Sequence, residues 1–550
     1  MKALALGALA LLGAPAQATD YYGTTEPFAS NAIYFVMTDR FVNGDTSNDH
    51  RHQGGAHPTF DIPVKGPDGQ SANIGYLGGD FKGILDNAGY IHGMGFGAVW
   101  ITPIVDNPDQ AFTGGKAVSF GSSFTDQGKT GYHGYWGDNF YKVDEHLESK
   151  DLSFSQFTAK MRQQGLKTVL DIVVNHGSPA YDMPAAQPKF GQLFDKDGKL
   201  IADHHNLPPD QLDPKDPLTA FFHRKAEMVQ LSNFNEDNPA VIDYFVGAYQ
   251  KWIDAGADAF RIDTIMWVDN AFWKTFSDRI RAKHPGFFMF GEAYDYNPAK
   301  IAPHTWPQNG AISVLDFPLK AALDKVFAKG EGFEALTPAL YLDKGPYQNP
   351  YQLTTFYDNH DMPRMNASDN GFIDANNWLF TARGIPVIYQ GSEVGFMRGA
   401  AEHAGNRNYF GQARIDAAPK SPIYQNLKRV GQLRAANVAL QKGLQLDLKL
   451  QGNEAQFLRV YQHQGVNQQA LVVLNKGDKV LDTTARGPLQ TGNWVDAVSG
   501  ETIRVKEGLA LRVQPHSLRV LLLDAPVTDP ALAKALNRLM ARPVDHKSGE

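Results

Sequence analysis

The sequence predicts a (β/α)8 barrel (TIM barrel) that carries an excursion domain after its third strand and is followed by an antiparallel β-sandwich. From about Asn31 to Ala436, short apolar runs rich in β-branched and aromatic residues alternate with amphipathic helical stretches. One interval between two of these runs is too long for an ordinary βα loop. Beyond Asn437 the pattern changes to short alternating strands. A chain of 550 residues can hold all three parts.

The barrel strands are the eight apolar runs of the first 436 residues. They span Ala32–Thr38, Gly97–Pro103, Lys167–Asn175, Ala257–Ile262, Gly286–Glu292, Ala311–Phe317, Gln352–Asp358 and Ile385–Gln390. Helices are expected between them, for example at Phe154–Gln164, Pro239–Ala255, Ala271–Lys283 and Tyr424–Ala435. Because strands and helices alternate, the sheet should be parallel, and the carboxyl ends of its strands should meet at one mouth.

Two segments depart from the alternation of strands and helices that is typical of the barrel. The interval between His176 and roughly Asn238 is rich in Pro, Asp, His and Gly, which predicts an excursion domain. The sandwich strands are expected at Gln456–Tyr461, Gln469–Leu474, Leu509–Val513 and Ser517–Leu523, with one short helix after Pro526. The expected organisation is a signal peptide at 1–18, barrel at 19–176 and 239–436, excursion domain at 177–238, β-sandwich at 437–525 and a tail at 526–550.

The N-terminus has the features of a signal peptide. Lys2 precedes the apolar stretch Ala3–Leu12, and Ala16-Gln17-Ala18 fits a small-x-small cleavage site. We therefore expect export, to the periplasm or the outside, and no membrane anchor, because the apolar run is too short to span a bilayer. The chain has no cysteine, so something other than disulfides must fix its long loops, and calcium is a natural candidate. The net charge of −7 argues against a nucleic-acid partner.

Acidic residues end several of the expected barrel strands. Asp171, Asp263, Glu292 and Asp361 should therefore gather at the mouth. Arg261 lies two residues before Asp263, so both side chains share one strand face, and the guanidinium favours the ionised carboxylate. Taken alone, Asp171 or Arg261 would more often belong to a structural ion pair; the combination points to chemistry.

The chemistry that fits is cleavage of a glycosidic bond with retention. It needs one ionised carboxylate as nucleophile and one protonated carboxyl group as acid, about 5–5.5 Å apart. Asp263 suits the first role, and Glu292, after the apolar run Phe287–Phe290, suits the second, because an apolar setting raises a carboxyl pKa. Asp361 would hold sugar hydroxyls and stabilise the transition state. His176 and His360 would donate hydrogen bonds to the sugar.

These segments resemble the signature regions of the α-amylase family, glycoside hydrolase family 13, in the order in which that family has them. The segments are Asp171–His176, Phe260–Asp263, Met289–Glu292 and Phe356–Asp361, supported by Gly95–Pro103 and Gly384–Gly391. The resemblance implies that Asp263 is the nucleophile, Glu292 the acid/base and Asp361 the transition-state stabiliser. It also implies substrate contacts from Arg261, His176, His360 and Asp171.

The N-terminal third is most similar to cyclodextrin glucanotransferases and related amylases. The similarity lies in Ile33–Phe41, Gly78–Phe81 and Tyr132–Trp136. It implies that His133 and Tyr135 line the site, with the Tyr135 ring stacked on the reacting sugar; ordinary barrel packing is the alternative for Tyr135. Because one β domain follows the barrel, raw-starch binding and cyclodextrin formation are less expected as main activities.

The first βα loop is the expected calcium site. Asn43–Asp49 concentrates oxygen-bearing side chains, which suits calcium but is also typical of Asx turns. The resemblance implies that calcium is bound by Asn43, Asp45, Asn48, Asp49, Gly78 and Asp80. A second family site would use Asn175, but the expected Asp of the excursion domain is Asn233 here, which weakens that site.

The segment after the nucleophile departs from the family pattern. α-1,4-Acting members typically have Lys and His where this chain has Met266 and Trp267. An ammonium donor is thus replaced by a thioether, and an imidazole by an indole that can stack on a sugar. We expect Trp267, together with Tyr294, to contact substrate and to favour a linkage such as α-1,6. In the alternative interpretation the loop has repacked and Trp267 is buried.

Three classes of function are weighed. The expected one is a retaining α-glucoside hydrolase acting on α-glucans or malto-oligosaccharides, with transglycosylation through the same intermediate, or a cyclodextrin glucanotransferase-like enzyme as the alternative. A non-catalytic sugar-binding relative would be expected to have lost one of the three carboxylates, which this chain keeps. A glycosidase of another sugar class would not be expected to match six motifs. Sequence alone does not decide between hydrolysis and transfer, the linkage, the chain length or the oligomeric state.

Overall fold

Eight parallel strands form the predicted barrel. The computed structural model describes residues 19–184 and 186–546, so the expected signal peptide lies outside the described residues. The strands are β1 (Ile33–Val36), β4 (Ala98–Ile101), β7 (Lys167–Ile172), β12 (Ala259–Ile262), β13 (Phe288–Gly291), β14 (Ser313–Val314), β15 (Thr354–Thr355) and β16 (Ile385–Tyr389). They pair in the order β14-β13-β12-β7-β4-β1-β16-β15, and a parallel bridge between Leu315 and Thr354 closes the barrel. Every strand falls inside a predicted range.

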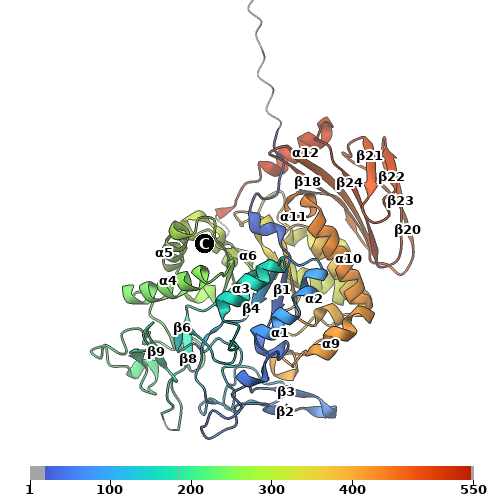
Figure 1. Cartoon of the computed structure of the whole chain (residues 1–550). Helices are drawn as coiled ribbons and strands as arrows, with labels where there is room; N and C mark the ends of the chain where they lie inside the picture. Colours follow the sequence, from blue (N-terminus) through green and yellow to red (C-terminus); the bar gives the residue numbers. More distant parts are fainter. Residues whose placement is uncertain (1–18, 185, 547–550) are drawn as a thin grey trace, which may run out of the picture.

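Helices surround this barrel, as the alternating pattern predicts (Figure 1). The sequence caps several of them: Ser153 and Gln156 form a capping box on α3, and Asn238 caps α4 before a proline at the first helical position. The helices up to the sandwich are α1 (Phe81–Asp86), α2 (Ala88–Gly93), α3 (Phe154–Gln163), α4 (Pro239–Asp254), α5 (Asn270–Lys283), α6 (Pro298–Ile301), α7 (Phe317–Leu323), α8 (Asp369–Thr381), α9 (Gln412–Ala417), α10 (Pro422–Ala436) and α11 (Val438–Lys442).

Strand alternation divides the apolar side chains between two cores. Phe35, Trp100 and Phe290 belong to one buried cluster, and the Phe35 and Trp100 rings stack with centroids 3.8 Å apart. Their neighbours Tyr34 and Val99 belong to the other cluster, which includes residues of the surrounding helices. Successive residues of a strand face opposite sides, so the first cluster fills the barrel and the second lies between barrel and helices.

The interval after the third strand forms small antiparallel pairs. In it β8 (His176–Pro179) pairs with β11 (Leu231–Asn233), and β9 (Gln192–Phe194) pairs with β10 (Leu200–Asp203). Before it, in the loops after β1 and β4, lie two further antiparallel pairs, β2 (Pro63–Lys65) with β3 (Ser71–Asn73) and β5 (Val105–Asp106) with β6 (Asn139–Val143). The boundaries 177 and 238 of the excursion domain stay predictions.

The C-terminal region is antiparallel, as predicted (Figure 1). A six-stranded sheet has the order β17-β18-β19-β24-β21-β22, and β20 pairs with β23. The strands are β17 (Leu444–Gln451), β18 (Glu454–His463), β19 (Val466–Asn475), β20 (Leu481–Ala485), β21 (Gly492–Asp496), β22 (Thr502–Val505), β23 (Leu509–Val513) and β24 (Ser517–Leu523). The tail forms helix α12 (Pro530–Met540), which contacts β17. Among residues 19–184 and 186–546, no helix is long and apolar enough to cross a membrane.

Candidate active site

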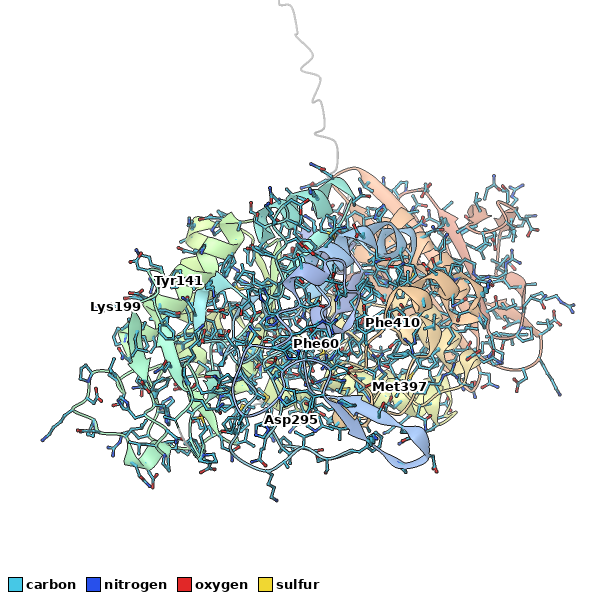
Figure 2. The ribbon with its side chains drawn as sticks, turned by 60° about the horizontal axis from the view of Figure 1, so that its bottom comes forward. Phe60, Tyr141, Lys199, Asp295, Met397 and Phe410 are labelled. Carbon is cyan, nitrogen blue, oxygen red and sulfur yellow. The ribbon has the colours of Figure 1, made fainter. Side chains whose placement is uncertain are left out.

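Four of the predicted site residues, Asp171, Arg261, Asp263 and Glu292, lie on the inward face of the barrel strands or directly continue it. Asp171 lies two residues after Val169, and Arg261 two residues after Ala259; both Val169 and Ala259 belong to the core inside the barrel. The register places Arg261 directly opposite Asp171 on β7 and Phe290 on β13. Because the period of a strand is two, Asp263 and Glu292 continue the same faces at the carboxyl ends. Figure 2 shows the side chains on the ribbon and labels Phe60, Asp295 and Met397, which belong to the loops after β1, β13 and β16.

One guanidinium connects three of the acidic side chains. Arg261 Nη1 lies 2.8 Å from Asp171 Oδ1 and 2.8 Å from Asp263 Oδ1, and Nη2 lies 2.9 Å from Glu292 Oε2. The arginine is fully buried, and Asp263 and Glu292 are nearly so. The prediction that Arg261 pairs with Asp263 is confirmed as a contact, and the structure adds Asp171 and Glu292 to that pair.

Glu292 has the setting of a carboxyl group that keeps its proton. Burial raises its pKa well above the usual range, and although Arg261 opposes this, the charges of Asp361, Asp263 and Asp171 raise it further. Its Oε1 is buried and has no hydrogen-bond partner in the described part of the chain. This oxygen is therefore available to donate a proton to a bound substrate.

Asp361 lies at the edge of this group and is its most exposed carboxylate. Its side chain is 28% exposed, against 8% for Asp263 and 6% for Glu292. His360 Nε2 lies 3.2 Å from Asp361 Oδ2, and Arg407 Nη2 lies 2.6 Å from Oδ1. Arg407 follows β16, and the sequence analysis missed it, because an arginine in an irregular loop gives no periodic signal.

Tyr135 is held against this group from the loop after β4. Its hydroxyl donates to Asp171 Oδ2 at 2.8 Å and lies 2.8 Å from His360 Nε2. The rings of His360 and His133 stack on Tyr135 with centroids 5.5 and 5.7 Å away. Burial raises the pKa of Asp171 to about 7 against the opposing charge of Arg261. The structure thus brings Tyr135, His133 and His360 together with the acidic group.

His176 is the first residue of β8 and is buried where the charge of Asp263, the nucleophile candidate, acts on it. Its ring Nδ1 lies 3.3 Å from Asn175 Nδ2, and burial lowers its pKa while the charge of Asp263 opposes this shift. A neutral imidazole can donate one hydrogen bond to a sugar hydroxyl. The predicted residue types therefore meet at one mouth, although their roles stay predictions.

Two of the predicted substrate contacts lie at the surface. Trp267 is 50% exposed and Tyr294 is 48% exposed. The alternative in which Trp267 is buried in a repacked loop is therefore wrong. Tyr296, which the sequence analysis did not single out, is 45% exposed and lies edge-on to Tyr294 at 6.3 Å between centroids. Exposed aromatic faces beside a polar mouth can stack on sugar rings.

The six residues of the expected calcium site come together around the first βα loop. Asn43 Nδ2 donates to Asp49 Oδ1 at 2.7 Å, and Asp80 accepts from the backbone nitrogen of Asp45 at 2.8 Å. Asn43 Oδ1 and Asn48 Oδ1 are buried and have no hydrogen-bond partner in the described chain. A bound cation would supply the missing partner of both oxygens. At Gly78, with φ +86°, a Cβ would lie 2.2 Å from Asn43 Nδ2, so only glycine fits. This oxygen-rich set fits calcium.

The expected second calcium site has weaker chemistry. Asn233 is buried, and both of its side-chain polar atoms lack partners in the described chain. Asn233 is the last residue of β11 and pairs with His176 of β8, and the backbone nitrogen of the next residue, Phe234, donates to the carbonyl oxygen of Asn175 at 3.0 Å. Asn175 and Asn233 provide neutral amides without the carboxylate that a calcium site prefers. The residues do not fit calcium as well as those of the first loop.

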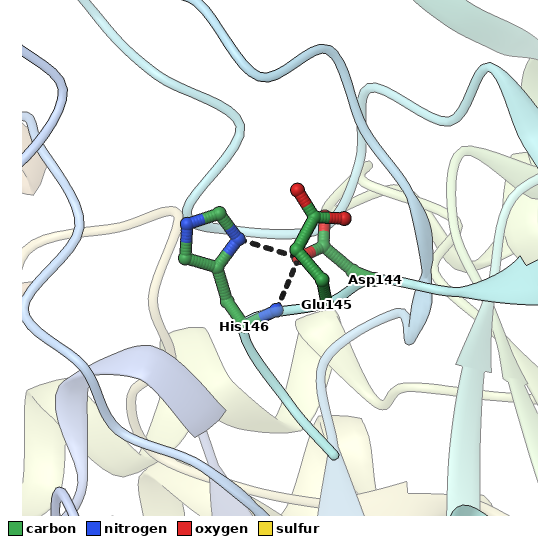
Figure 3. Close-up of side chains that lie close together, drawn as sticks. All are labelled: Asp144, Glu145 and His146. Atoms are coloured by element: carbon green, nitrogen blue, oxygen red, sulfur yellow. Dashed lines mark hydrogen bonds and ion pairs between the residues drawn. The ribbon is translucent and has the colours of Figure 1, made fainter. Parts of the chain in front are cut away.

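A third acidic group lies after β6 and is an internal ion pair (Figure 3). Asp144 Oδ1 accepts from the backbone nitrogen of His146 at 3.0 Å and contacts its ring Nδ1 at 2.7 Å. The Tyr76 ring stacks on His146 with centroids 3.8 Å apart. Asp144 Oδ1 and His146 Nδ1, which could otherwise bind a metal ion, already bind each other. The ion pair and the stacked Tyr76 ring therefore account for this cluster without a metal.

The family is shown by comparison with known proteins. The family model described as alpha amylase, catalytic domain, matches residues 35–412. A cyclomaltodextrin glucanotransferase of Klebsiella oxytoca is 28% identical, covering 82% of this chain and 71% of that protein. An alpha-amylase of Niallia circulans is 27% identical, covering 92% of each. Among solved structures, CldA, described as the first cyclomaltodextrin glucanotransferase with a three-domain ABC distribution, has a TM-score of 0.70 and 29% identity, covering 90% of this chain and 99% of that one. The chain therefore belongs to the α-amylase family, as a glycosidase or glucanotransferase.

Proposed function

We propose that the protein is a retaining α-glucoside hydrolase that acts on α-glucans or malto-oligosaccharides through a covalent glucosyl intermediate. The observation that carries this proposal is the Arg261 guanidinium in contact with Asp171, Asp263 and Glu292. One buried cation contacts both Asp263 and Glu292, and the pKa of Glu292 is raised; retaining cleavage requires one ionised carboxylate and one proton-bearing carboxyl group side by side.

Asp263 would be the nucleophile. Arg261 contacts its Oδ1, which leaves Oδ2 to attack the anomeric carbon. As the bond from this carbon to the leaving oxygen breaks, Glu292 Oε1–H would pass its proton to that oxygen. Glu292 then takes a proton from water, whose oxygen attacks the same carbon and releases Asp263. Two displacements at one carbon retain the α configuration.

The other residues would bind the reacting sugar. Asp361 would accept hydrogen bonds from sugar hydroxyls and offset the positive charge of the oxocarbenium-like transition state. His176 and His360 would donate to hydroxyls, and Tyr135 would offer its ring face. Tyr135 is held in place by Asp171 and by the stacked rings of His133 and His360.

Calcium would belong to the fold and not to the reaction. The residues that would hold it are Asn43, Asp45, Asn48, Asp49, Gly78 and Asp80, and it would offset their charge and tie the first βα loop to α1. Asp80 also caps α1 by accepting from the Gly83 backbone nitrogen at 2.7 Å. We also propose export, on the strength of the N-terminal pattern Lys2–Ala18.

Glucanotransfer is the second candidate, and the exposed aromatic side chains favour it. Trp267, Tyr294 and Tyr296 could hold an acceptor sugar, whose hydroxyl would replace water in the second displacement. CldA is described as a cyclomaltodextrin glucanotransferase with three domains, so an arrangement of a barrel, an excursion segment and a β domain is compatible with transfer. The same surface would support a preference for α-1,6 over interior α-1,4 bonds.

Product analysis tests these proposals. The purified protein would be incubated with α-1,4, α-1,6 and cyclic glucans, and the products followed by NMR and chromatography. The α-anomer should appear first; the β-anomer as first product would refute the retaining mechanism. Products longer than the substrate would establish transfer.

A further inference from the structure

A second buried arginine, Arg407, contacts Asp361, whereas Arg261 contacts the other three acidic side chains of the group. Arg407, in the loop after β16, has a side chain that is 7% exposed. Its Nη2 lies 2.6 Å from Asp361 Oδ1, and its Nε donates to the carbonyl of His360 at 3.1 Å. The guanidinium is thus fixed to both the side chain of Asp361 and the backbone immediately before it.

Arg407 is itself held by a chain of alternating charges. Its Nη1 lies 2.7 Å from Glu402 Oε1. Lys129 Nζ lies 3.7 Å from the same oxygen and 2.5 Å from Asp126 Oδ1. Burial by itself would raise the pKa of Glu402, but the charges of Arg407 and Lys129 outweigh burial and hold this pKa well below its usual range. Glu402 therefore stays ionised and keeps Arg407 oriented.

This network matters because Asp361 is the least enclosed of the three carboxylates. Packing alone does not fix a side chain that is 28% exposed. Its Oδ1 is placed by Arg407 and its Oδ2 lies near His360 Nε2. An ionised Asp361 also repels the other acidic groups of the mouth, and the charge of Arg407 offsets this repulsion.

We propose that Arg407, oriented by Glu402 and Lys129, is a positioning residue that holds Asp361 in the orientation the transition state needs. The inference rests on the proposed function, in which Asp361 acts on the reacting sugar. The competing possibility is that Arg407 binds only a sugar farther along the donor chain. The two differ in whether a donor of one glucose unit is affected.

The test uses α-glucosyl fluoride, which fills only the site of the reacting sugar and has a leaving group that needs no proton. Arg407→Met should lower kcat on this substrate by about 100-fold with little change in KM, because misplacing a catalytic group by about 1 Å costs this much. Glu402→Gln should lower kcat by about tenfold, and Arg407→Lys should regain at least tenfold over Arg407→Met. Arg398→Met, at an arginine of the same loop that pairs with Asp369, is the matched control and should leave kcat unchanged.

The outcomes separate the inference from the proposed function. If folded Arg407→Met, or folded Glu402→Gln where Arg407→Met does not fold, keeps the wild-type kcat on α-glucosyl fluoride, the positioning role is wrong. A rise in KM for malto-oligosaccharides alone would then assign Arg407 to a distant sugar. If instead the wild type does not hydrolyse α-glucosyl fluoride, or Asp263→Asn hydrolyses it as the wild type does, the proposed function itself fails.

Discussion

Replacing the proposed acid, Glu292→Gln, should separate the two halves of the reaction. The amide has the size of the carboxyl group but cannot release a proton to the leaving oxygen. General acid catalysis is worth about 10²–10⁴-fold. Glu292 is 5% exposed, so water has little access to replace it, and we expect a loss near 10⁴ on natural glucans. That corresponds to about 5 kcal/mol of transition-state stabilisation.

With α-glucosyl fluoride the first displacement should survive. The pKa of Glu292 is raised well above its usual range, so the active form is neutral, and glutamine replaces one neutral group with another beside Arg261 Nη2. First-turnover fluoride release should therefore change by less than about tenfold. The second displacement lacks its base, so a glucosyl adduct on Asp263 should accumulate, and azide, which needs no base, should restore turnover.

The assay is a fluoride burst in a rapid-mixing experiment, followed by mass spectrometry of the intact protein. The pH dependence provides an independent check. Glu292 must be protonated, so wild-type kcat/KM should fall as the pH rises through its raised pKa, and this limb should be missing from the fluoride burst of Glu292→Gln. The role assignment is refuted if Glu292→Gln loses the fluoride burst as completely as it loses natural glucans.

Three further results are expected. Chelation should lower the Tm more than the initial activity, because calcium in the first βα loop stabilises the fold by binding the native state; an unchanged Tm in protein proven metal-free would remove that site. Met266→Lys/Trp267→His should shift preference toward linear α-1,4 chains, and the wild type should cleave soluble starch weakly; brisk starch cleavage with no shift in the double variant would leave an ordinary amylase. His223 and Glu236 form an ion pair in which the hydrogen bond that His223 donates to Glu236 raises the pKa of His223, and the pKa of Glu236 is lowered although burial opposes this. The His223 contribution is lost as pH rises through its raised pKa, and the Glu236 contribution as pH falls through its lowered one. His223→Gln should therefore cost about 1 kcal/mol near pH 5.5 and less near pH 8.5, measured by denaturant unfolding; an equal loss at both values would contradict the pairing.

Local periodicity was enough to find the barrel. Each of the eight strands is a short apolar run, and a strand places every second side chain on one face, so the positions of Arg261 and Asp263 on a common inward face follow from their spacing alone. The acid role that we propose for Glu292 was suggested by the apolar run before it, because burial raises a carboxyl pKa, and the pKa of Glu292 is raised. These are properties of neighbouring residues, which a sequence displays directly.

Contacts between distant loops were decided only by the tertiary structure. Arg407 contacts Asp361, 46 residues earlier in the chain. Lys129, in the loop after β4, contacts Glu402, in the loop after β16. Neither contact can be predicted from the periodicity of the sequence, because the position of an irregular loop depends on the residues against which it packs. The same holds for Trp267: its indole could have been buried or exposed, and in the folded chain it is 50% exposed. The sequence by itself thus determined which residue types stand at the strand ends, whereas folding decided which charges touch and which rings face the solvent.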